Sequence, residues 1–244
     1  MPASLWTRLA RQPRYDPLDC RANPCMNNVA KTKPWLPYVA PFGLYLLFLQ
    51  LQGSFPQALV WLYPAKTIAV AGTLLYFRKS YEELRPGFSW LAIAVGLVAI
   101  IIWVAIDPFY PHLGELMRMK SKVFDPTTLV PVARWAFIGF RVAGAVLVVP
   151  LMEELFWRAC ALRWIDNEDF KSVPVGVFSW KAFAVTVLLF GAEHNEWLAG
   201  LICGALYNWL LARTRSIWAC VVAHAVSNAG LAAWVLARGD WKLW

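Results

Sequence analysis

The chain has 244 residues, of which 59% are hydrophobic and only 16% are charged, and it contains 15 tryptophans. Soluble domains carry roughly a quarter charged residues, so this composition indicates a protein whose surroundings are largely lipid. The formal net charge is +8, but most basic residues lie between apolar blocks, without the aromatic interleaving typical of RNA binding. The composition therefore favours an integral membrane protein in contact with membrane lipid and excludes nucleic acid as the expected partner.

The first segment, residues 1–35, is predicted to be a basic cytoplasmic tail. The positive-inside rule places clusters of Lys and Arg on the cytoplasmic side of a membrane. Six basic residues lie within the first 33 positions: Arg8, Arg11, Arg14, Arg21, Lys31 and Lys33. The first 30 residues lack the apolar stretch of a signal peptide, so we expect the segment to be retained. Cys20 and Cys25 are interpreted as incidental thiols, because a single C-x4-C pair is weak support for a metal site or a disulfide.

Seven apolar stretches predict an all-α fold, a polytopic helical bundle with about seven membrane helices and eight as the alternative count. They are residues 36–52, 57–77, 89–106, 142–164, 179–193, 197–212 and 216–237. Residues 131–140 are predicted to lie on the membrane surface ahead of the fourth span, which is expected to kink at Pro150. The Gly200-x-x-x-Gly204 pair predicts a close helix contact.

The stretches divide into N-terminal membrane helices and loops over residues 36–128 and a C-terminal core over residues 129–244. The core holds the last four helices. With the N terminus in the cytoplasm, the basic loops after the second, fourth and sixth stretches fall on the cytoplasmic side, and the turn at Asn195 falls outside. One basic loop, residues 118–122, opposes this orientation.

Polar side chains within apolar stretches are the informative residues of a membrane protein. Each ionisable group near the middle of the bilayer costs about 2.5–3.5 kcal/mol on insertion scales, so it is rarely retained without a partner or a function. The N-terminal helices offer little beyond Lys66, which is expected to reach a membrane interface. In the core, Glu154 and Arg158 are four residues apart and can neutralise each other. Glu153 is then left without a basic partner on its own helix.

Two further helices repeat the four-residue spacing, with His224 and Asn228 on one and Phe190 and His194 on the other. Any one of these pairs is explained more simply as a contact that holds two helices together. A glutamate, two histidines and an asparagine on three helices are better explained by one shared polar cavity, since a bundle satisfies buried polar groups by turning them toward each other.

Three motifs in this order resemble those of the CAAX prenyl endopeptidase and bacteriocin-processing (Abi, or CPBP) family of intramembrane proteases. They are E-E-x-x-x-R at residues 153–158, F-x-x-x-H at residues 190–194 and H-x-x-x-N at residues 224–228. The resemblance covers roughly residues 142–237. It implies an intramembrane endopeptidase, a hydrolase that cuts a membrane-associated or lipid-modified protein. Together with the compact loops, it implies a place in the bacterial plasma (inner) membrane.

The resemblance also implies roles for individual residues. Glu153 would be the general base that activates a water molecule, assisted by His194. His224 and Asn228 would stabilise the oxyanion that forms when this water attacks a peptide carbonyl group. The supporting residues would be Glu154, Arg158 and Phe190.

The sequence leaves the need for a metal ion open. Glu153, His194 and His224 form a two-histidine, one-carboxylate set, which suits a catalytic zinc ion with an open position for water. The sequence contains no H-E-x-x-H motif. Of the two possibilities, we expect the absence of a tightly bound catalytic metal.

Two other assignments compete with this reading of the site. Glu193 or Glu196, on either side of His194, could orient the imidazole or act as the base in place of Glu153. Cys220 lies one helical turn before His224 and could form a thiol–imidazole pair with it. A function of a different class is a non-catalytic membrane protein (an immunity factor, a scaffold or a small transporter) in which the polar cluster serves structure or proton binding.

Overall fold

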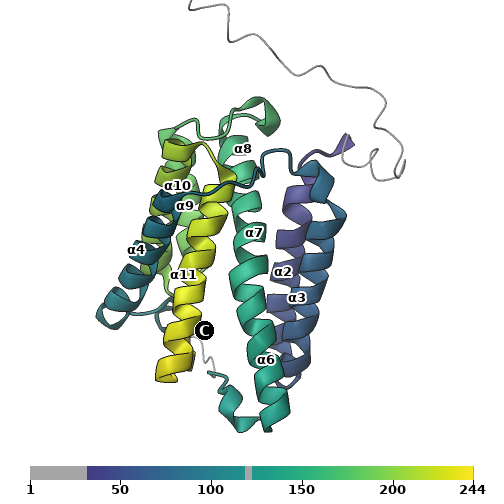
Figure 1. Cartoon of the computed structure of the whole chain (residues 1–244), viewed down its shortest axis with the longest axis vertical. Helices are drawn as coiled ribbons and strands as arrows, with labels where there is room; N and C mark the ends of the chain where they lie inside the picture. Colours follow the sequence, from purple (N-terminus) through teal and green to yellow (C-terminus); the bar gives the residue numbers. More distant parts are fainter. Residues whose placement is uncertain (1–31, 119–122, 244) are drawn as a thin grey trace, which may run out of the picture. The chain divides into compact units, whose positions relative to one another are not determined.

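The structure, a computed structural model, describes residues 32–118 and 123–243. Residues Trp35–Trp244 form one compact unit, a helical bundle (Figure 1). The described residues contain helices and connecting loops but no strand, which confirms the all-α prediction. The predicted basic tail, including Cys20 and Cys25, lies outside the described residues except at its last few positions.

The helices follow the predicted apolar stretches closely. In chain order they are α2 (Leu36–Ser54), α3 (Leu59–Tyr76), α4 (Trp90–Ile106), α5 (Leu113–Leu116), α6 (Pro131–Ala143), α7 (Val149–Glu154), α8 (Leu162–Asp166), α9 (Trp180–Ala192), α10 (Trp197–Thr214) and α11 (Ile217–Arg238). Three of the long helices begin at a serine whose side chain accepts a hydrogen bond from a backbone N–H of the first turn, which satisfies a group that a helix start leaves unpaired. These serines are Ser89, Ser179 and Ser216.

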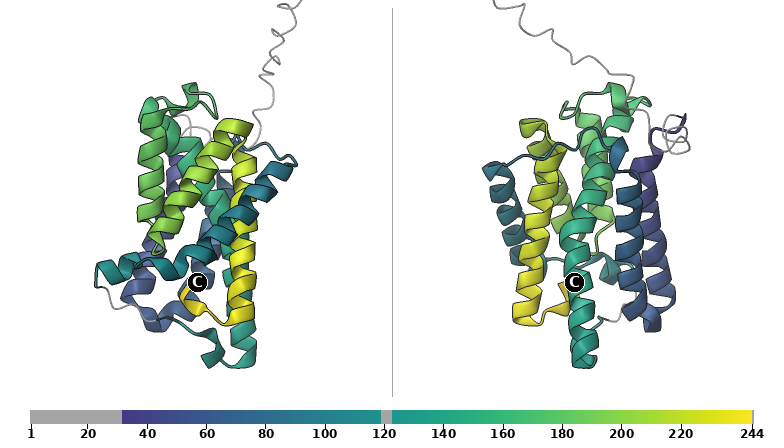
Figure 2. Two further views of the ribbon diagram at one scale, coloured as in Figure 1. Left: turned by 90° about the vertical axis from the view of Figure 1, so that its left-hand side faces the viewer. Right: turned by 45° about the vertical axis from the view of Figure 1, so that its right-hand side comes forward.

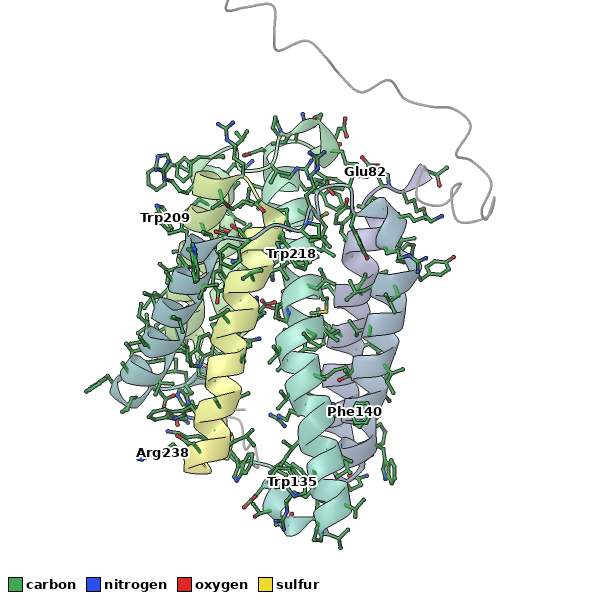
Figure 3. All side chains as sticks on the ribbon, in the orientation of Figure 1. Glu82, Trp135, Phe140, Trp209, Trp218 and Arg238 are labelled. Atoms are coloured by element: carbon green, nitrogen blue, oxygen red, sulfur yellow. The ribbon has the colours of Figure 1, made fainter. Side chains whose placement is uncertain are left out.

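Four helical runs in the described ranges are long and apolar enough to cross a membrane. They are Pro56–Tyr76, Trp90–Leu116, Pro131–Asp166 and Ile217–Arg238. Large apolar side chains also project outward from the helices, as Trp135 and Trp209 do toward opposite ends of the bundle (Figure 3). The protein is therefore an integral membrane protein, and membrane crossing by α2, α9 and α10 stays a prediction.

The fourth span is one continuous helical run, so the prediction of a separate surface-lying segment over residues 131–140 is wrong. In Figure 1, α6 continues directly into α7. Two π-helical segments, Gly144–Val148 and Leu155–Ala161, lie before and after α7. In the first, the Val149 N–H donates to the Gly144 carbonyl group, five residues back. This wider turn accommodates Pro150, which has no N–H to donate and whose ring crowds the preceding turn of an α-helix.

The basic loops that were predicted to share one side of the membrane lie at one end of the bundle. The Tyr38 hydroxyl group donates to the Ser80 carbonyl group, and its ring lies 5.8 Å from the Lys171 ammonium group. Close by in the fold, an added Cβ at Gly176 would be 2.8 Å from the Arg215 side chain. The loops after α3, α8 and α10 therefore meet at this end, as the alternating topology requires.

Glycines allow the helices that carry the site to approach closely. An added Cβ at Gly200 would lie 3.1 Å from Gly191 Cα and 3.3 Å from the His194 side chain, and one at Gly204 would lie 3.3 Å from Phe190. These distances confirm the predicted close contact and show that it joins α10 to α9. Gly96 of α4 allows the same close approach to α11, where an added Cβ would meet Ala223 and Val226. The two helices lie side by side in both views of Figure 2.

We predict that Gly96→Ala destabilises the bundle by about 1–3 kcal/mol, the usual range for overpacking. The added methyl group would overlap the Ala223 carbonyl oxygen and lie 2.8 Å from Val226 Cβ, so α4 and α11 would have to move apart. Thermal unfolding in detergent measures the effect. Gly72→Ala is the matched control, because it adds a Cβ in a helix with nothing within 4 Å. Equal melting temperatures for the two variants would contradict the close α4–α11 packing.

Candidate active site

Glu153 lies on α7, between the two π-helical segments, and is 5% exposed. Its Oε2 atom is 4.0 Å from His224 Nε2 on α11. Within the described part of the chain, this buried oxygen accepts no hydrogen bond. A buried polar atom without a partner is rare and calls for an explanation such as a catalytic role or a bound water molecule.

Glu154, the next residue, connects two of the predicted site residues. Its Oε1 atom accepts a hydrogen bond from Arg158 Nη1 at 3.1 Å, which is the ion pair predicted from the four-residue spacing. The same oxygen lies 2.9 Å from His224 Nδ1. A carboxylate on one ring nitrogen fixes the orientation of an imidazole, so Glu154 directs His224 Nε2 toward Glu153. Sequence spacing could not reveal this contact, because the two residues are 70 positions apart.

Arg158 is the largest of the fully buried side chains in the described residues, at 1% exposure. Its guanidinium group lies 4.4 Å from the Phe190 ring and 5.4 Å from the Tyr207 ring. Planar guanidinium groups stack favourably on aromatic rings, so the Phe190 ring, which projects from α9, stabilises the position of the Arg158 side chain.

His194 follows the last turn of α9, and its Nδ1 atom lies 2.7 Å from the Phe190 carbonyl oxygen. That hydrogen bond places the proton on Nδ1 and leaves Nε2 as an acceptor. Because α9 has only 13 residues, or about 20 Å of helix, the turn that follows it lies part of the way along α11 (Figure 2). His194 is thereby brought to the level of Glu153.

Glu193 lies with Glu153 and His194. From the sequence, it is one of two alternatives to Glu153 for the role of base. A ligand atom from each of Glu153, Glu193 and His194 lies within 4.8 Å of the others. The Glu193 Oε1 atom accepts a hydrogen bond of 2.9 Å from Trp157 Nε1. The indole therefore holds the Glu193 carboxylate beside Glu153.

The His224–Asn228 face of α11 completes the cluster. The His224 ring is stacked on the Tyr207 ring at 5.3 Å between centroids. The Asn228 side-chain Nδ2 donates to the Ala145 carbonyl group at 2.8 Å, inside the first π-helical segment. A π-helical turn leaves carbonyl groups outside the regular α-helical pattern, which makes this one available to a neighbouring helix.

A cavity of about 580 Å³ connects these residues. Its lining includes all four predicted catalytic residues: Glu153, His194, His224 and Asn228. The volume is in the range of pockets that hold small ligands. The lining also includes Lys242, whose ammonium group donates to Asp107 at 2.8 Å, and this hydrogen bond raises the pKa of Lys242.

Helices outside the motifs contribute to the same cavity. Lys66 of α3, which was expected to reach a membrane interface, is 3% exposed and lines the cavity instead. The sequence prediction was wrong because tertiary packing turns this face of α3 toward α2 and α6. Tyr45 and Tyr63 line the cavity beside it.

The structure weakens two of the alternative assignments. The Cys220 thiol contacts the Tyr207 carbonyl group at 3.5 Å, while His224 Nδ1 contacts Glu154, so these residues form no thiol–imidazole pair. Glu196 accepts a hydrogen bond from its neighbour Asn195 at 3.1 Å and is not part of the carboxylate cluster.

The side chains fit a divalent cation, with one change from the predicted ligands. Glu193, not His224, completes the compact set with Glu153 and His194. The Phe190 carbonyl group and the Trp157 indole orient His194 and Glu193 as outer-sphere partners commonly orient metal ligands.

Comparison with protein families shows that residues 135–230 match the type II CAAX prenyl endopeptidase Rce1-like family. The match includes all three motifs and lies inside the predicted C-terminal core. No curated protein and no solved structure matches the chain. The family resemblance inferred from the motifs is thereby confirmed.

Proposed function

Because residues 135–230 belong to the Rce1-like family of type II CAAX prenyl endopeptidases, we propose that this protein is an intramembrane endopeptidase. It hydrolyses a peptide bond of a membrane-associated or lipid-modified protein. The single observation on which the proposal depends is the environment of the Glu153 Oε2 atom. It is buried, accepts no hydrogen bond from the described residues, and faces His224 Nε2 across 4.0 Å in a cavity that also contains His194.

In the proposed reaction, a water molecule binds between Glu153 and His194. Glu153 removes a proton as the water oxygen attacks the carbonyl carbon of the substrate, and the proton then passes to the leaving nitrogen atom. No described residue donates a hydrogen bond to Glu153 Oε2, so no hydrogen bond has to break before this oxygen takes the proton. His194 keeps Nε2 free to accept the second hydrogen of the water, since its Nδ1 is held by the Phe190 carbonyl group.

The negative charge that develops on the carbonyl oxygen requires donors. His224 Nδ1 is held by the Glu154 carboxylate, so its Nε2 atom points toward Glu153 and donates to the oxyanion when it carries a proton. Asn228 has two N–H groups on its amide nitrogen, and one donates to Ala145, which leaves the second for the oxyanion. The ion pair of Arg158 with Glu154 holds this arrangement in place.

The alternative, a non-catalytic membrane protein, is less well supported by the same geometry. A cluster that only joins helices gains from pairing every buried polar atom, since each unpaired one costs about 1–3 kcal/mol. Glu153 Oε2 is left unpaired among the described residues while Glu154 makes two contacts beside it. This difference favours a structural role for the Glu154 carboxylate and a reactive role for the Glu153 carboxylate.

To test the proposal, the protein is reconstituted in liposomes together with a library of single-span and lipidated peptides. The incubation is carried out in H₂¹⁸O. Cleavage should produce a new C-terminal carboxylate that contains one ¹⁸O atom, detected by mass spectrometry. If folded wild-type protein cuts no member of the library, the protease proposal fails and the non-catalytic alternative takes its place.

We further propose that no tightly bound metal is needed, so cleavage should be unchanged after treatment with EDTA or phenanthroline. If zinc binds, Glu153, Glu193 and His194 would hold it, and it would acidify a bound water molecule. The measurement is the cleavage rate before and after chelation, with metal content determined by mass spectrometry. Loss of activity that stoichiometric zinc restores would contradict the prediction, and Glu193→Gln should then weaken zinc binding.

The proposed location is the bacterial inner membrane with the N terminus in the cytoplasm. Its support is the family membership, the four long apolar helices and the grouping of the basic loops at one end of the bundle.

A further inference from the structure

The cavity around Glu153 is closed toward the end of the bundle where the basic loops meet. On α10 the lining residue nearest to this end is Tyr207, seven positions before the last residue of the helix. On α11 it is His224, seven positions after the first residue. Seven residues of α-helix span about 10 Å. In this layer Leu210 and Cys220 are 0% exposed, so closely packed side chains separate the cavity from the basic loops.

At the opposite end the lining continues past the ends of the helices. Asn195 follows α9, Val123 follows α5 and Lys242 follows α11. These connections are joined to each other, since the Leu113 N–H donates to the Asn195 carbonyl group at 2.8 Å. Asn195 is exposed, and the Lys242 side chain is 48% exposed. The cavity therefore opens at this end, and its mouth is the rim formed by Asn195, Val123 and Lys242.

The two ends of the bundle face different sides of the membrane. The start of α2 lies at the end with the basic loops, because the Tyr38 hydroxyl group donates to the Ser80 carbonyl group. With the N terminus in the cytoplasm, as proposed above, that end is cytoplasmic and the mouth is extracytoplasmic. A peptide bond at the cytoplasmic surface would have to cross the packed layer to reach Glu153.

We propose that the cavity receives its substrate from the extracytoplasmic side of the membrane. The substrate is then a peptide segment that is exposed on the outer face, as part of an exported or membrane-anchored protein. A protein that a lipid anchor holds at the cytoplasmic surface is excluded. The inference rests on the proposed function and the proposed orientation, and it narrows the class of substrate for the same site.

The same opening supplies the water that hydrolysis consumes. Packed protein interiors contain few voids as large as a water molecule, so the closed layer is a poor path for water. The mouth has polar side chains at the surface, and its rim residue Asn195 directly follows His194 in the chain. Water that enters there reaches the imidazole beside which the proposed reaction places it.

Thiol accessibility from each side of the membrane tests the proposal without any cleavage. Cys20 and Cys25 are replaced by serine in the full chain, and the protein without an added cysteine gives the background of the buried native thiols. Leu231→Cys places a thiol on the cavity wall, seven positions along α11 from His224 toward the mouth. A charged, membrane-impermeant methanethiosulfonate should modify it in right-side-out vesicles and leave it unmodified in inverted vesicles.

Three further variants make this result specific. Val235→Cys is the matched control on the same helix: it is 0% exposed and lies outside the lining, so it should react from neither side. Lys79→Cys, at an exposed position among the basic loops, should react only in inverted vesicles. Val123→Cys, at a rim position that is 56% exposed, should react only in right-side-out vesicles and provides a second readout if Leu231→Cys does not fold.

Modification of Leu231→Cys or Val123→Cys from the inverted side would overturn the proposal, because the mouth would then face the cytoplasm. Modification of Lys79→Cys in right-side-out vesicles would overturn the orientation and the proposal with it. A folded Leu231→Cys protein that reacts from neither side would show that the mouth is closed. Since cleavage is not measured, access from outside in a protein that cuts no peptide would disprove only the protease proposal.

Discussion

Replacing Glu153 by glutamine should reduce peptide cleavage by about 10²–10⁴-fold, the usual contribution of a general base. The glutamine amide has nearly the same shape as the carboxyl group but cannot take a proton from water. Because Glu153 Oε2 accepts no hydrogen bond in the described residues, the change removes no contact that holds the helices together. The melting temperature of the variant should therefore equal or exceed that of the wild type.

The measurement pairs single-turnover cleavage in liposomes with thermal unfolding in detergent. Glu82→Gln is the matched control: it changes an exposed carboxylate at the end of the bundle and should leave both quantities unaltered (Figure 3). A Glu153→Gln protein that cleaves at the wild-type rate would transfer the role of base to another carboxylate, with Glu193 the first to examine. A protein that unfolds would support the structural reading of the cluster.

Replacing Arg158 by methionine, in contrast to Glu153→Gln, should lower the stability of the protein by about 3–5 kcal/mol, as expected when one partner of a buried ion pair is removed. Glu154, which is fully buried, would lose the Nη1 donor that lies 3.1 Å from its Oε1 atom. The loss of the guanidinium group would also remove its contacts with the Phe190 and Tyr207 rings. Activity should fall as well, because the carboxylate that orients His224 would no longer be held.

A double variant separates charge from packing. If the cost arises mainly from the uncompensated carboxylate, Glu154→Gln combined with Arg158→Met should recover much of the lost stability without restoring activity. Arg85→Met, at an exposed loop position, is the control for loss of an arginine and should be close to neutral. If Arg158→Met unfolds at the wild-type temperature, the ion pair does not stabilise the bundle and its assignment as a supporting residue is wrong.

The helical membrane fold could be predicted because it depends on local properties of the chain. A run such as residues 89–106 contains no charge and can satisfy its backbone hydrogen bonds in a bilayer only as a helix. The pairing of Glu154 with Arg158 was predictable for a similar reason. Helix geometry alone places side chains four residues apart on one face.

Other features depend on packing between helices and were missed or mistaken. The prediction of a separate surface-lying segment over residues 131–140 was wrong because α6 continues into α7 through the π-helical segment Gly144–Val148, whose wider turn also accommodates Pro150. A π-helical turn has no sequence signature comparable to hydrophobic periodicity. Lys66 was assigned to an interface because a lysine near the middle of an apolar stretch gives no indication of which neighbours will enclose it.

The sequence by itself determined that this protein is an all-helical membrane protein with the motifs of a CAAX-type endopeptidase, and it named the glutamate, histidines and asparagine of the site. Only the tertiary structure decided that Glu154 orients His224, that Glu193 lies beside Glu153, and that Lys66 lines the same cavity. The reason is physical. Contacts within a helix follow from its fixed rise and rotation, whereas contacts between helices depend on how glycines, short helices and π-turns allow separate segments to approach.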